Sequence, residues 1–195
     1  MQSIAIFASG AGSNARQIIQ HFKHHNQIRV SLIVCNKPGA GVITIAEQEG
    51  IPLLLINREE FFHGDAYVPI LKKYQINYII LAGFLWKIPP SLIEAFAGKI
   101  VNIHPALLPR YGGKGMYGQH VHEAVLASGD HESGISIHYV DELYDHGQLI
   151  FQARCPVEPG DSPQSLAEKI HRLEHQHYPH VIEELILQEV TAKSR

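Results

Sequence analysis

The stretch IAIFASGAGSN, residues 4–14, joins an apolar run to a glycine-rich turn and the start of a helix. The run at 4–8 contains no polar residue, which is typical of a parallel strand buried on both faces. From Ser13 to Lys23, apolar residues recur at helical spacing. A buried strand that passes through glycines into a helix predicts the first unit of an α/β fold.

The same alternation continues to about residue 104. Apolar runs predict further strands, and amphipathic segments predict the helices between them. The strands are expected at 28–35, 52–56, 78–82 and 100–103, and the helices at 41–48, 65–74 and 90–96. Helices that connect parallel strands cover both faces of the sheet, so we expect a Rossmann-like, mostly parallel sheet.

The pattern changes after residue 110. A glycine-rich loop at 112–115 leads into a predicted helix at 119–127. Two extended runs, 135–140 and 149–157, predict an antiparallel strand pair. A long amphipathic helix is expected from Ser165 to about Gln188, started by residues 161–163. With no repeat and no convincing linker, residues 1–195 are expected to form a single domain.

The overall composition fits a soluble enzyme. The 195 residues are 45% hydrophobic and 18% charged with a net charge of -3, so neither nucleic acid nor an anionic membrane is expected as a main partner. Cys35 and Cys155 lie in strand-like runs, where we expect buried, reduced thiols and a cytoplasmic location. No signal-peptide pattern and no apolar stretch of bilayer length is present.

The segment NIHPALLP at 102–109 carries the first chemical signal. Asn102 and His104 are two residues apart at the end of a strand, so their side chains share one face. An amide that can donate to a developing oxyanion beside a titratable ring suits acyl transfer. A strand end with two ordinary, satisfied polar side chains is the alternative.

The turn at residues 9–14 carries the second signal. Free backbone amides and the positive end of the helix face an anion in such a turn. No Gly-Lys-Ser/Thr follows, and Ala15 and Arg16 stand where a dinucleotide fingerprint would need its third glycine. We therefore favour the phosphate of a small substrate over a nicotinamide cofactor, with a plain strand-to-helix turn as the alternative.

The segment DELYDHG at 141–147 is the third signal, with three carboxylates in five residues. A carboxylate beside a histidine stabilises its charged form and raises its pKa. Such a segment is most often an acidic hairpin turn, and it gains interest only together with Asn102 and His104.

These motifs, with LAGF at 81–84 and LEHQHYP at 173–179, occur in an order that resembles the phosphoribosylglycinamide formyltransferase family. NIHPALLP is shared across the wider formyltransferase superfamily, whereas SGAGSN is more specific to this branch. The resemblance runs from the first strand to the last helix. Because the chain ends where this branch ends, we expect neither the additional C-terminal domain of methionyl-tRNA formyltransferases nor the N-terminal domain of formyltetrahydrofolate deformylases.

The resemblance implies transfer of a formyl group from 10-formyltetrahydrofolate to the amine of glycinamide ribonucleotide in purine synthesis, without a metal. It implies a phosphate-binding half at about 1–100 and a folate-binding, catalytic half at about 81–195, in a monomer or homodimer. The implied catalytic residues are Asn102, His104 and Asp145. The implied ribonucleotide-binding residues are Gly12, Ser13, Asn14, His171, Arg172, Leu173 and Glu174. The implied folate-binding residues are Leu85, Trp86, Lys87, Ile88, Asn102, Asp141, Glu142, Leu143, Tyr144 and Asp145.

Some positions depart from the family's common pattern. Trp86-Lys87 replaces an arginine followed by an apolar residue, and Gly64 stands near an arginine position that meets the folate tail in some members. The loop GGKGMYGQH at 112–120 is longer and richer in glycine than usual.

The 14 histidines raise the question of a metal site. His171 and His175 have a helical spacing that could hold zinc, but no third ligand accompanies them, so a solvated helix face is favoured. We expect solvent-facing side chains at His21, His24 and His25, at the end of the first helix. His138 is expected either near the active site or as a satisfied core residue.

Three other functions remain open. The first is another folate-dependent formyltransferase or a formyltetrahydrofolate hydrolase, which the identity of the acceptor would distinguish. The second is a nucleotide-binding oxidoreductase, against which the incomplete glycine pattern argues. The third is a non-catalytic module, which would leave Asn102, His104 and Asp145 with no reason to coexist.

Overall fold

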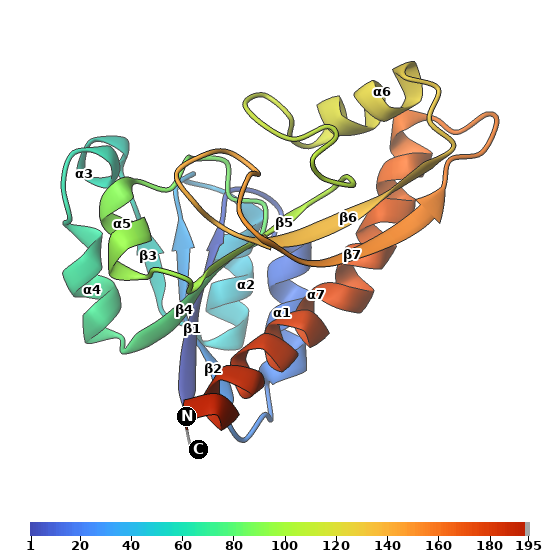
Figure 1. Ribbon diagram of the computed structural model, residues 1–195. Helices are drawn as coiled ribbons and strands as arrows, with labels where there is room; N and C mark the ends of the chain where they lie inside the picture. The colour runs from blue at the N-terminus through green and yellow to red at the C-terminus, as the bar shows by residue number, and fades with distance from the viewer. Residues whose placement is uncertain (194–195) are drawn as a thin grey trace.

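A seven-stranded sheet with the strand order β3-β2-β1-β4-β5-β6-β7 forms the centre of the computed structural model, which describes residues 1–193 (Figure 1). The strands are β1 (Gln2–Ala8), β2 (Ile28–Cys35), β3 (Leu53–Leu55), β4 (Ile76–Leu81), β5 (Ile100–His104), β6 (Glu132–Tyr139) and β7 (Leu149–Pro156). The helices are α1 (Ser13–Phe22), α2 (Gly41–Glu49), α3 (Arg58–Phe62), α4 (Tyr67–Lys73), α5 (Pro90–Ala95), α6 (Gln119–Ala127) and α7 (Pro163–Lys193).

The first five strands pair in parallel, as the apolar runs predict. The predicted antiparallel pair of β6 and β7 is confirmed, and β6 also pairs antiparallel with β5. This second pairing extends the parallel sheet into the antiparallel part without a break. The fold class expected from the sequence is therefore confirmed.

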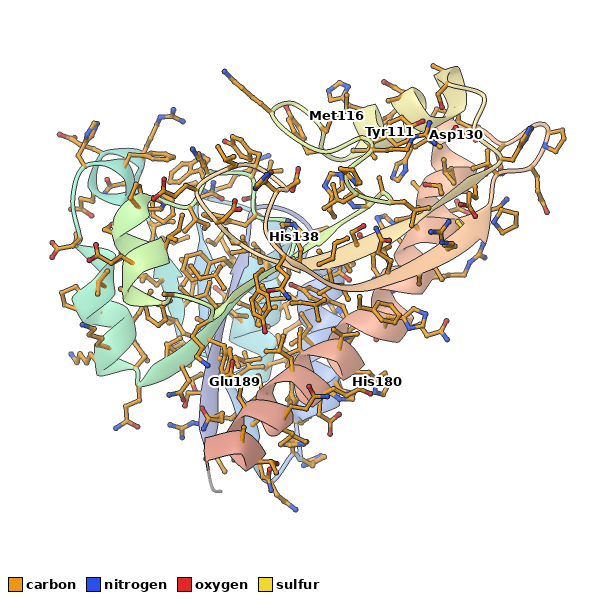
Figure 2. The ribbon with its side chains drawn as sticks, in the orientation of Figure 1. Tyr111, Met116, Asp130, His138, His180 and Glu189 are labelled. Atoms are coloured by element: carbon orange, nitrogen blue, oxygen red, sulfur yellow. The ribbon has the colours of Figure 1, made fainter. Side chains whose placement is uncertain are left out.

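Alternating side chains of the strands feed two apolar cores, one on each face of the sheet (Figure 2). On β1, Ile4 and Ile6 pack with α1, α2 and α7, whereas Ala5 and Phe7 pack with α3, α4 and α5. The hydroxyl of Tyr178 on α7 donates to the carbonyl of Leu81 at 2.9 Å and lies 3.2 Å from that of Val101, which ties α7 to the ends of β4 and β5.

Helix α3 was missed in the sequence, although a local signal for it exists. Asn57 caps the helix by accepting a hydrogen bond from the backbone amide of Glu60 at 2.9 Å. An N-cap residue followed three positions later by Glu is a helix-start pattern. Helix α7 also runs beyond the expected 165–188 at both ends.

Three expectations about single residues need correction. Cys35 is buried as expected, but Cys155 is half-buried; both are free thiols. His21 and His25 are partly buried against Glu183 of α7, because α1 packs on α7, while His24 is exposed as expected.

None of the helices within residues 1–193 has the length and apolar character needed to cross a bilayer.

Candidate active site

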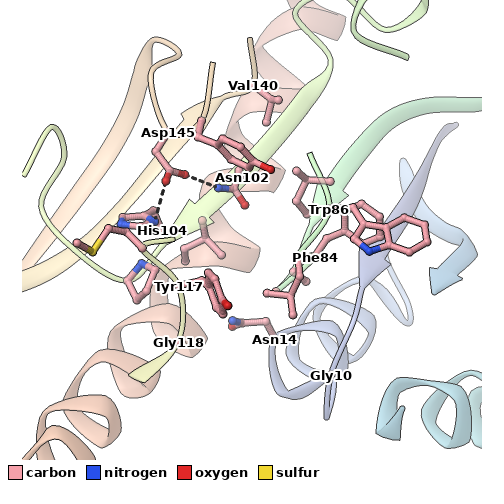
Figure 3. A pocket seen from close by; sticks show the side chains of 18 of the residues that line it. Gly10, Asn14, Phe84, Trp86, Asn102, His104, Tyr117, Gly118, Val140 and Asp145 are labelled. Atoms are coloured by element: carbon pink, nitrogen blue, oxygen red, sulfur yellow. Dashed lines mark hydrogen bonds and ion pairs between the residues drawn. The ribbon is translucent and has the colours of Figure 1, made fainter. Parts of the chain in front are cut away.

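A cavity of about 800 Å³ lies at the carboxyl ends of β1, β4 and β5. Strand order reverses between β1 and β4, and α/β sheets bind ligands in the crevice at such a switch point. The wall of the cavity combines the turn after β1, the segment after β4, the end of β5, the loop before α6 and the segment after β6 (Figure 3). All three chemical signals of the sequence therefore meet in one cavity.

The register of β5 and β6 brings a second histidine to Asn102. Asn102 lies opposite His138 in the antiparallel pair, and His138 is only 2% exposed. The ring Nδ1 of His138 is 2.7 Å from the carbonyl of Tyr139, which can only accept, so Nδ1 donates. The Nε2 of the neutral ring then accepts from the Asn102 amide nitrogen at 3.1 Å. His138 thus selects the orientation of the Asn102 amide.

Asp145 connects the polar groups of the cavity. One carboxylate oxygen, Oδ2, accepts from the Gly113 backbone amide at 3.0 Å and lies 3.5 Å from Nδ1 of His104. The other, Oδ1, lies 3.5 Å from Nδ2 of Asn102 and 3.7 Å from Nε2 of His138. Both predicted partners, Asn102 and His104, therefore converge on the predicted aspartate.

Burial raises the pKa of Asp145, but the surrounding donors and positive charges lower it more. These are the nearby His138 ring, the charge of His104 and the Gly113 backbone amide. The net pKa of Asp145 lies below its ordinary value, so the carboxylate is ionised at neutral pH.

His104 is 3% exposed and has an acceptor at each ring nitrogen. Its Nε2 lies 2.7 Å from the Tyr111 carbonyl, and its Nδ1 faces Asp145. Only the imidazolium form donates from both nitrogens. Burial nevertheless lowers the pKa of His104 by more than Asp145 and the Tyr111 carbonyl raise it. Asp145 raises the pKa of His104, as a carboxylate beside a histidine is expected to, but it offsets only part of the effect of burial.

The turn after β1 positions Gly12, Ser13 and Asn14 along the cavity at the N-terminus of α1. Gly12 is the N-cap, with φ 80°. A Cβ at Gly12 would lie 2.8 Å from Ile45 Cδ1 and 2.9 Å from Val42 Cβ. Glycine is therefore required here for the packing of α1 on α2, in addition to any close approach of a ligand.

Asn14 connects this turn to α7. Its amide nitrogen donates to Glu174 Oε2 at 2.9 Å, while its buried Oδ1 has no hydrogen-bond partner among residues 1–193. Burial raises the pKa of Glu174, opposed by the Asn14 hydrogen bond and the charge of His171. A bound ligand with a hydroxyl or amide donor would satisfy the free Asn14 oxygen.

Not every residue implied by the resemblance reaches the cavity. On α7, His171 and Glu174 line the wall, whereas Arg172 is exposed outside it and Leu173 packs against the core. Glu142 is exposed and is also absent from the wall. Helical geometry explains the α7 result, because residues three apart share a face and the two between them turn away.

The remaining predicted folate residues form one part of the wall. Leu85, Trp86, Lys87 and Ile88 line it from the segment after β4, and Asp141, Leu143 and Tyr144 line it from the segment after β6. Leu85 and Leu143 are 55% and 57% exposed, so two apolar side chains lie at the open side of the cavity. Exposed apolar groups gathered around a cavity mark a ligand-binding surface.

Trp86, the main departure from the family pattern, is held by aromatic packing. Its ring centroid lies 5.5 Å from that of Phe61 and 5.6 Å from that of Phe62. The adjacent Lys87 places its ammonium 5.8 Å from the centre of the Tyr144 ring. Gly64 lies outside the wall of this cavity.

Sequence reasoning missed His122 and left the role of the glycine-rich loop open. Residues 113–118 of that loop line the cavity, and Gly113 holds Asp145. His122 of α6 is 4% exposed, and burial together with the charges of His171 and His104 lowers its pKa to about 4. The apolar neighbours Val121 and Val125 were the only sequence signal that this part of the helix is buried.

Comparison with known proteins agrees with the motifs. The family model for formyl transferase matches residues 2–182. Phosphoribosylglycinamide formyltransferase of Bacillus subtilis (strain 168) is 36% identical in an alignment of 191 residues that covers 95% of each chain. The chloroplastic phosphoribosylglycinamide formyltransferase of Arabidopsis thaliana is 40% identical in an alignment of 187 residues that covers 93% of this chain and 64% of that one.

Solved structures show the same similarity. Phosphoribosylglycinamide formyltransferase from Bacillus halodurans superimposes with a TM-score of 0.86 at 35% identity over 95% of each chain. Glycinamide ribonucleotide transformylase 1 from Geobacillus kaustophilus has a TM-score of 0.86 at 38% identity, over 95% of this chain and 98% of that one. This chain spans only about three-fifths of the plant relatives, 64% and 61% of their lengths.

Proposed function

The chain belongs to the formyl transferase family, and we propose that it transfers a formyl group from 10-formyltetrahydrofolate to the amine of glycinamide ribonucleotide in purine biosynthesis. The observation that carries the proposal is one cavity with three chemically distinct parts. A helix N-terminus at Gly12–Asn14 suits a phosphate, an apolar side at Leu85 and Leu143 suits a pterin, and Asp145 lies among polar donors.

The residues present fit both substrates. The backbone amides at the start of α1 face the cavity where a 5'-phosphate would bind, and Glu174 and the free oxygen of Asn14 suit ribose hydroxyls. Ile88 and Val140 add apolar surface where a planar pterin would lie. A volume of about 800 Å³ is within the range of small-molecule sites.

In this proposal Asn102 and His104 stabilise the oxyanion that develops on the formyl oxygen. The Asn102 amide already donates to His138, and its contact with Asp145 is long at 3.5 Å, so the hydrogen directed there can turn to the formyl oxygen. Protonated Nδ1 of His104, facing the same aspartate, supplies the second donor. His138 is a positioning residue that keeps the nitrogen of the amide in place.

The proposed exchange balances without a metal or redox partner. The substrate amine forms a bond to the formyl carbon, and the bond from that carbon to N10 of the folate breaks. One proton leaves the amine, and one proton reaches N10. Ionised Asp145 stabilises protonated His104 and can accept a hydrogen bond from a water that carries the proton between the two nitrogens.

In this proposal, as the resemblance implies, about residues 1–100 bind the phosphate, and about residues 81–195 bind folate and carry out catalysis. The proposal also keeps a cytoplasmic location, small-molecule partners alone, and a monomer or homodimer.

Incubation of the purified protein with both substrates tests the proposal. We expect tetrahydrofolate to be released in step with formylated ribonucleotide, measured by absorbance and mass spectrometry. Release of tetrahydrofolate at the same rate without the ribonucleotide would instead identify a hydrolase. No turnover of the formyl donor under either condition would overturn the proposal.

A further inference from the structure

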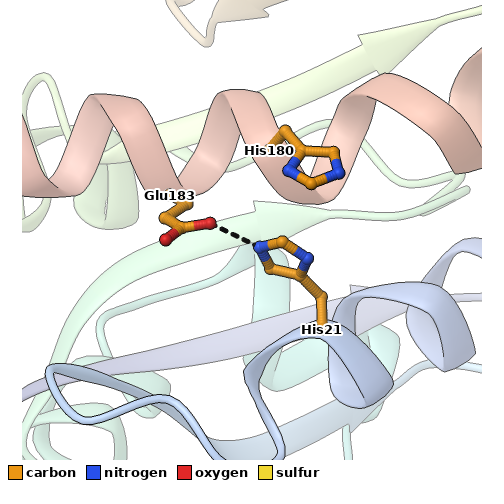
Figure 4. A group of neighbouring side chains, drawn as sticks. All are labelled: His21, His180 and Glu183. Carbon is orange, nitrogen blue, oxygen red and sulfur yellow. Dashed lines mark hydrogen bonds and ion pairs between the residues drawn. The ribbon is translucent and has the colours of Figure 1, made fainter.

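A second group of histidines lies between α1 and α7, outside the cavity wall. It consists of His21 from the last turn of α1 and of His180 and Glu183 from α7, and we call it the α1–α7 cluster (Figure 4). His180 and Glu183 are three residues apart and therefore share one helix face. Neither residue on α7 was singled out in the sequence with His21, because the packing of α1 on α7 alone brings them together.

The side chains of the cluster already converge on one point. One possible ligand atom from each residue lies within 4.8 Å of the other two. Nε2 of His21 is 2.6 Å from Glu183 Oε2, and the rings of His21 and His180 meet edge to face with centroids 4.6 Å apart. The cluster joins two imidazoles and a carboxylate, which together are ligands that Zn²⁺ and related ions prefer.

His25 contacts the carboxylate of Glu183 from outside the cluster. Its Nδ1 accepts from the backbone amides of Gln27 and Ile28, at 3.1 and 2.9 Å. The hydrogen of the neutral ring must then lie on Nε2, which donates to Glu183 Oε1 at 3.1 Å. His25 therefore orients the carboxylate through Oε1, as outer-shell groups do for metal-binding carboxylates, while Oε2 faces Nε2 of His21.

We propose that the α1–α7 cluster binds one divalent transition-metal ion, Zn²⁺ in the first instance, through His21, His180 and Glu183. Tetrahedral coordination at about 2.1 Å separates ligand atoms by roughly 3.4 Å. The ion would replace the hydrogen bond between Nε2 of His21 and Oε2 of Glu183, now 2.6 Å apart, and Nε2 would bind it without its proton. A water molecule completes the coordination. Mg²⁺ and Ca²⁺ prefer sets made wholly of oxygen ligands and do not fit two imidazoles.

This site is separate from the cavity and does not depend on the proposed function. His21 follows Asn14 by seven residues, which is roughly 10 Å along α1, and His180 follows Glu174 by six, roughly 9 Å along α7. Figure 2 likewise shows His180 on α7 well apart from His138. The metal would tether α1 to α7 about two turns beyond the Asn14–Glu174 hydrogen bond.

Titration of the chelator-treated protein with Zn²⁺ by calorimetry near neutral pH tests the inference, with Co²⁺ absorption spectra as a second readout. We expect a one-to-one binding event that His180→Ala and Glu183→Gln each weaken by more than roughly 100-fold. His25→Ala should weaken it by roughly 10- to 100-fold, as the loss of an outer-shell partner does. His24→Ala is the matched control, because this exposed neighbour of His25 belongs to neither site, and it should bind as the parent does.

Thermal unfolding distinguishes Zn²⁺ binding at the α1–α7 cluster from Zn²⁺ binding to the histidines of the cavity. Zn²⁺ should raise the unfolding midpoint of the parent and of His24→Ala but leave that of His180→Ala nearly unchanged, because a ligand of the folded state stabilises only where it binds. The inference is overturned if the parent takes up no Zn²⁺ below about 1 mM. It is equally overturned if His180→Ala keeps every binding event of the parent.

Discussion

Replacing Asp145 with asparagine removes one negative charge from the polar centre of the cavity and leaves the side-chain shape nearly unchanged. The backbone at Asp145 has φ 53°, a left-handed conformation that asparagine tolerates as aspartate does. The variant should therefore fold normally, and its activity should report the charge of the carboxylate.

The size of the effect follows from the His104–Asp145 distance of 3.5 Å. An opposite charge this close shifts a pKa by about one to three units, and Asp145 is the largest influence that raises the pKa of His104 against burial. Without it we expect that pKa to fall by this amount. The protonated fraction of His104 at neutral pH, and with it kcat, should fall roughly 10- to 1,000-fold.

The assay is the pH dependence of kcat, which reports groups in the enzyme–substrate complex. The alkaline limb of the profile should move toward acid by about one to three pH units in Asp145→Asn. Glu168→Gln, an acid-to-amide change at an exposed position of α7, is the control and should keep the parental profile. A profile of Asp145→Asn that coincides with the parental one would refute the role of Asp145 in keeping His104 protonated.

Three further variants test other parts of the molecule. Asn102→Ala should lower kcat roughly 100- to 1,000-fold with little change in either KM in steady-state kinetics; an effect confined to KM would remove Asn102 from stabilisation of the oxyanion. Glu174→Gln should weaken the hydrogen bond from Asn14 and raise the KM for the ribonucleotide roughly tenfold or more, whereas equal rises for both substrates would mean that Glu174 serves only the fold. His122 has its pKa lowered from 6.5 to about 4 in the folded protein, so the unfolded chain binds its proton first as the pH falls. The folded state should lose about 3 kcal/mol of stability as the pH falls between these two values. The free energy of unfolding, measured in urea, should therefore depend less on pH in His122→Gln than in the parent; an equal pH dependence in the two proteins would contradict this account.

Local patterns in the sequence predicted the elements that form the site. Strand β1 and the start of α1 follow from an apolar run, glycines and helical spacing, all within about twenty residues. Asn102 and His104 share a face because strand geometry alone places residues two apart on the same side. The segments that hold Asn14 and Asp145 stood out locally, but the catalytic role of Asp145 and the part of Glu174 came only from the resemblance to a family, since nothing local to these segments shows which groups meet.

Tertiary structure decided what these groups do. The register of β5 and β6 places His138 against Asn102, and this pairing depends on hydrogen bonds between strands more than thirty residues apart. Burial lowers the pKa of His104 below what the neighbouring carboxylate implies. Desolvation depends on every atom around a group, so no short segment of sequence encodes it.

The histidines show most clearly which features follow from the sequence and which depend on the packed structure. In the sequence, His21 and His25 lie at the end of the first helix like exposed polar residues, and His180 belongs to a distant segment. Packing of α1 on α7 buries part of two of them against Glu183 and forms the α1–α7 cluster. Sequence by itself determined which segments become helices and strands, because those preferences act between near neighbours. Only the packed structure decided which histidines meet a carboxylate, because that depends on contacts between helices more than 150 residues apart in the chain.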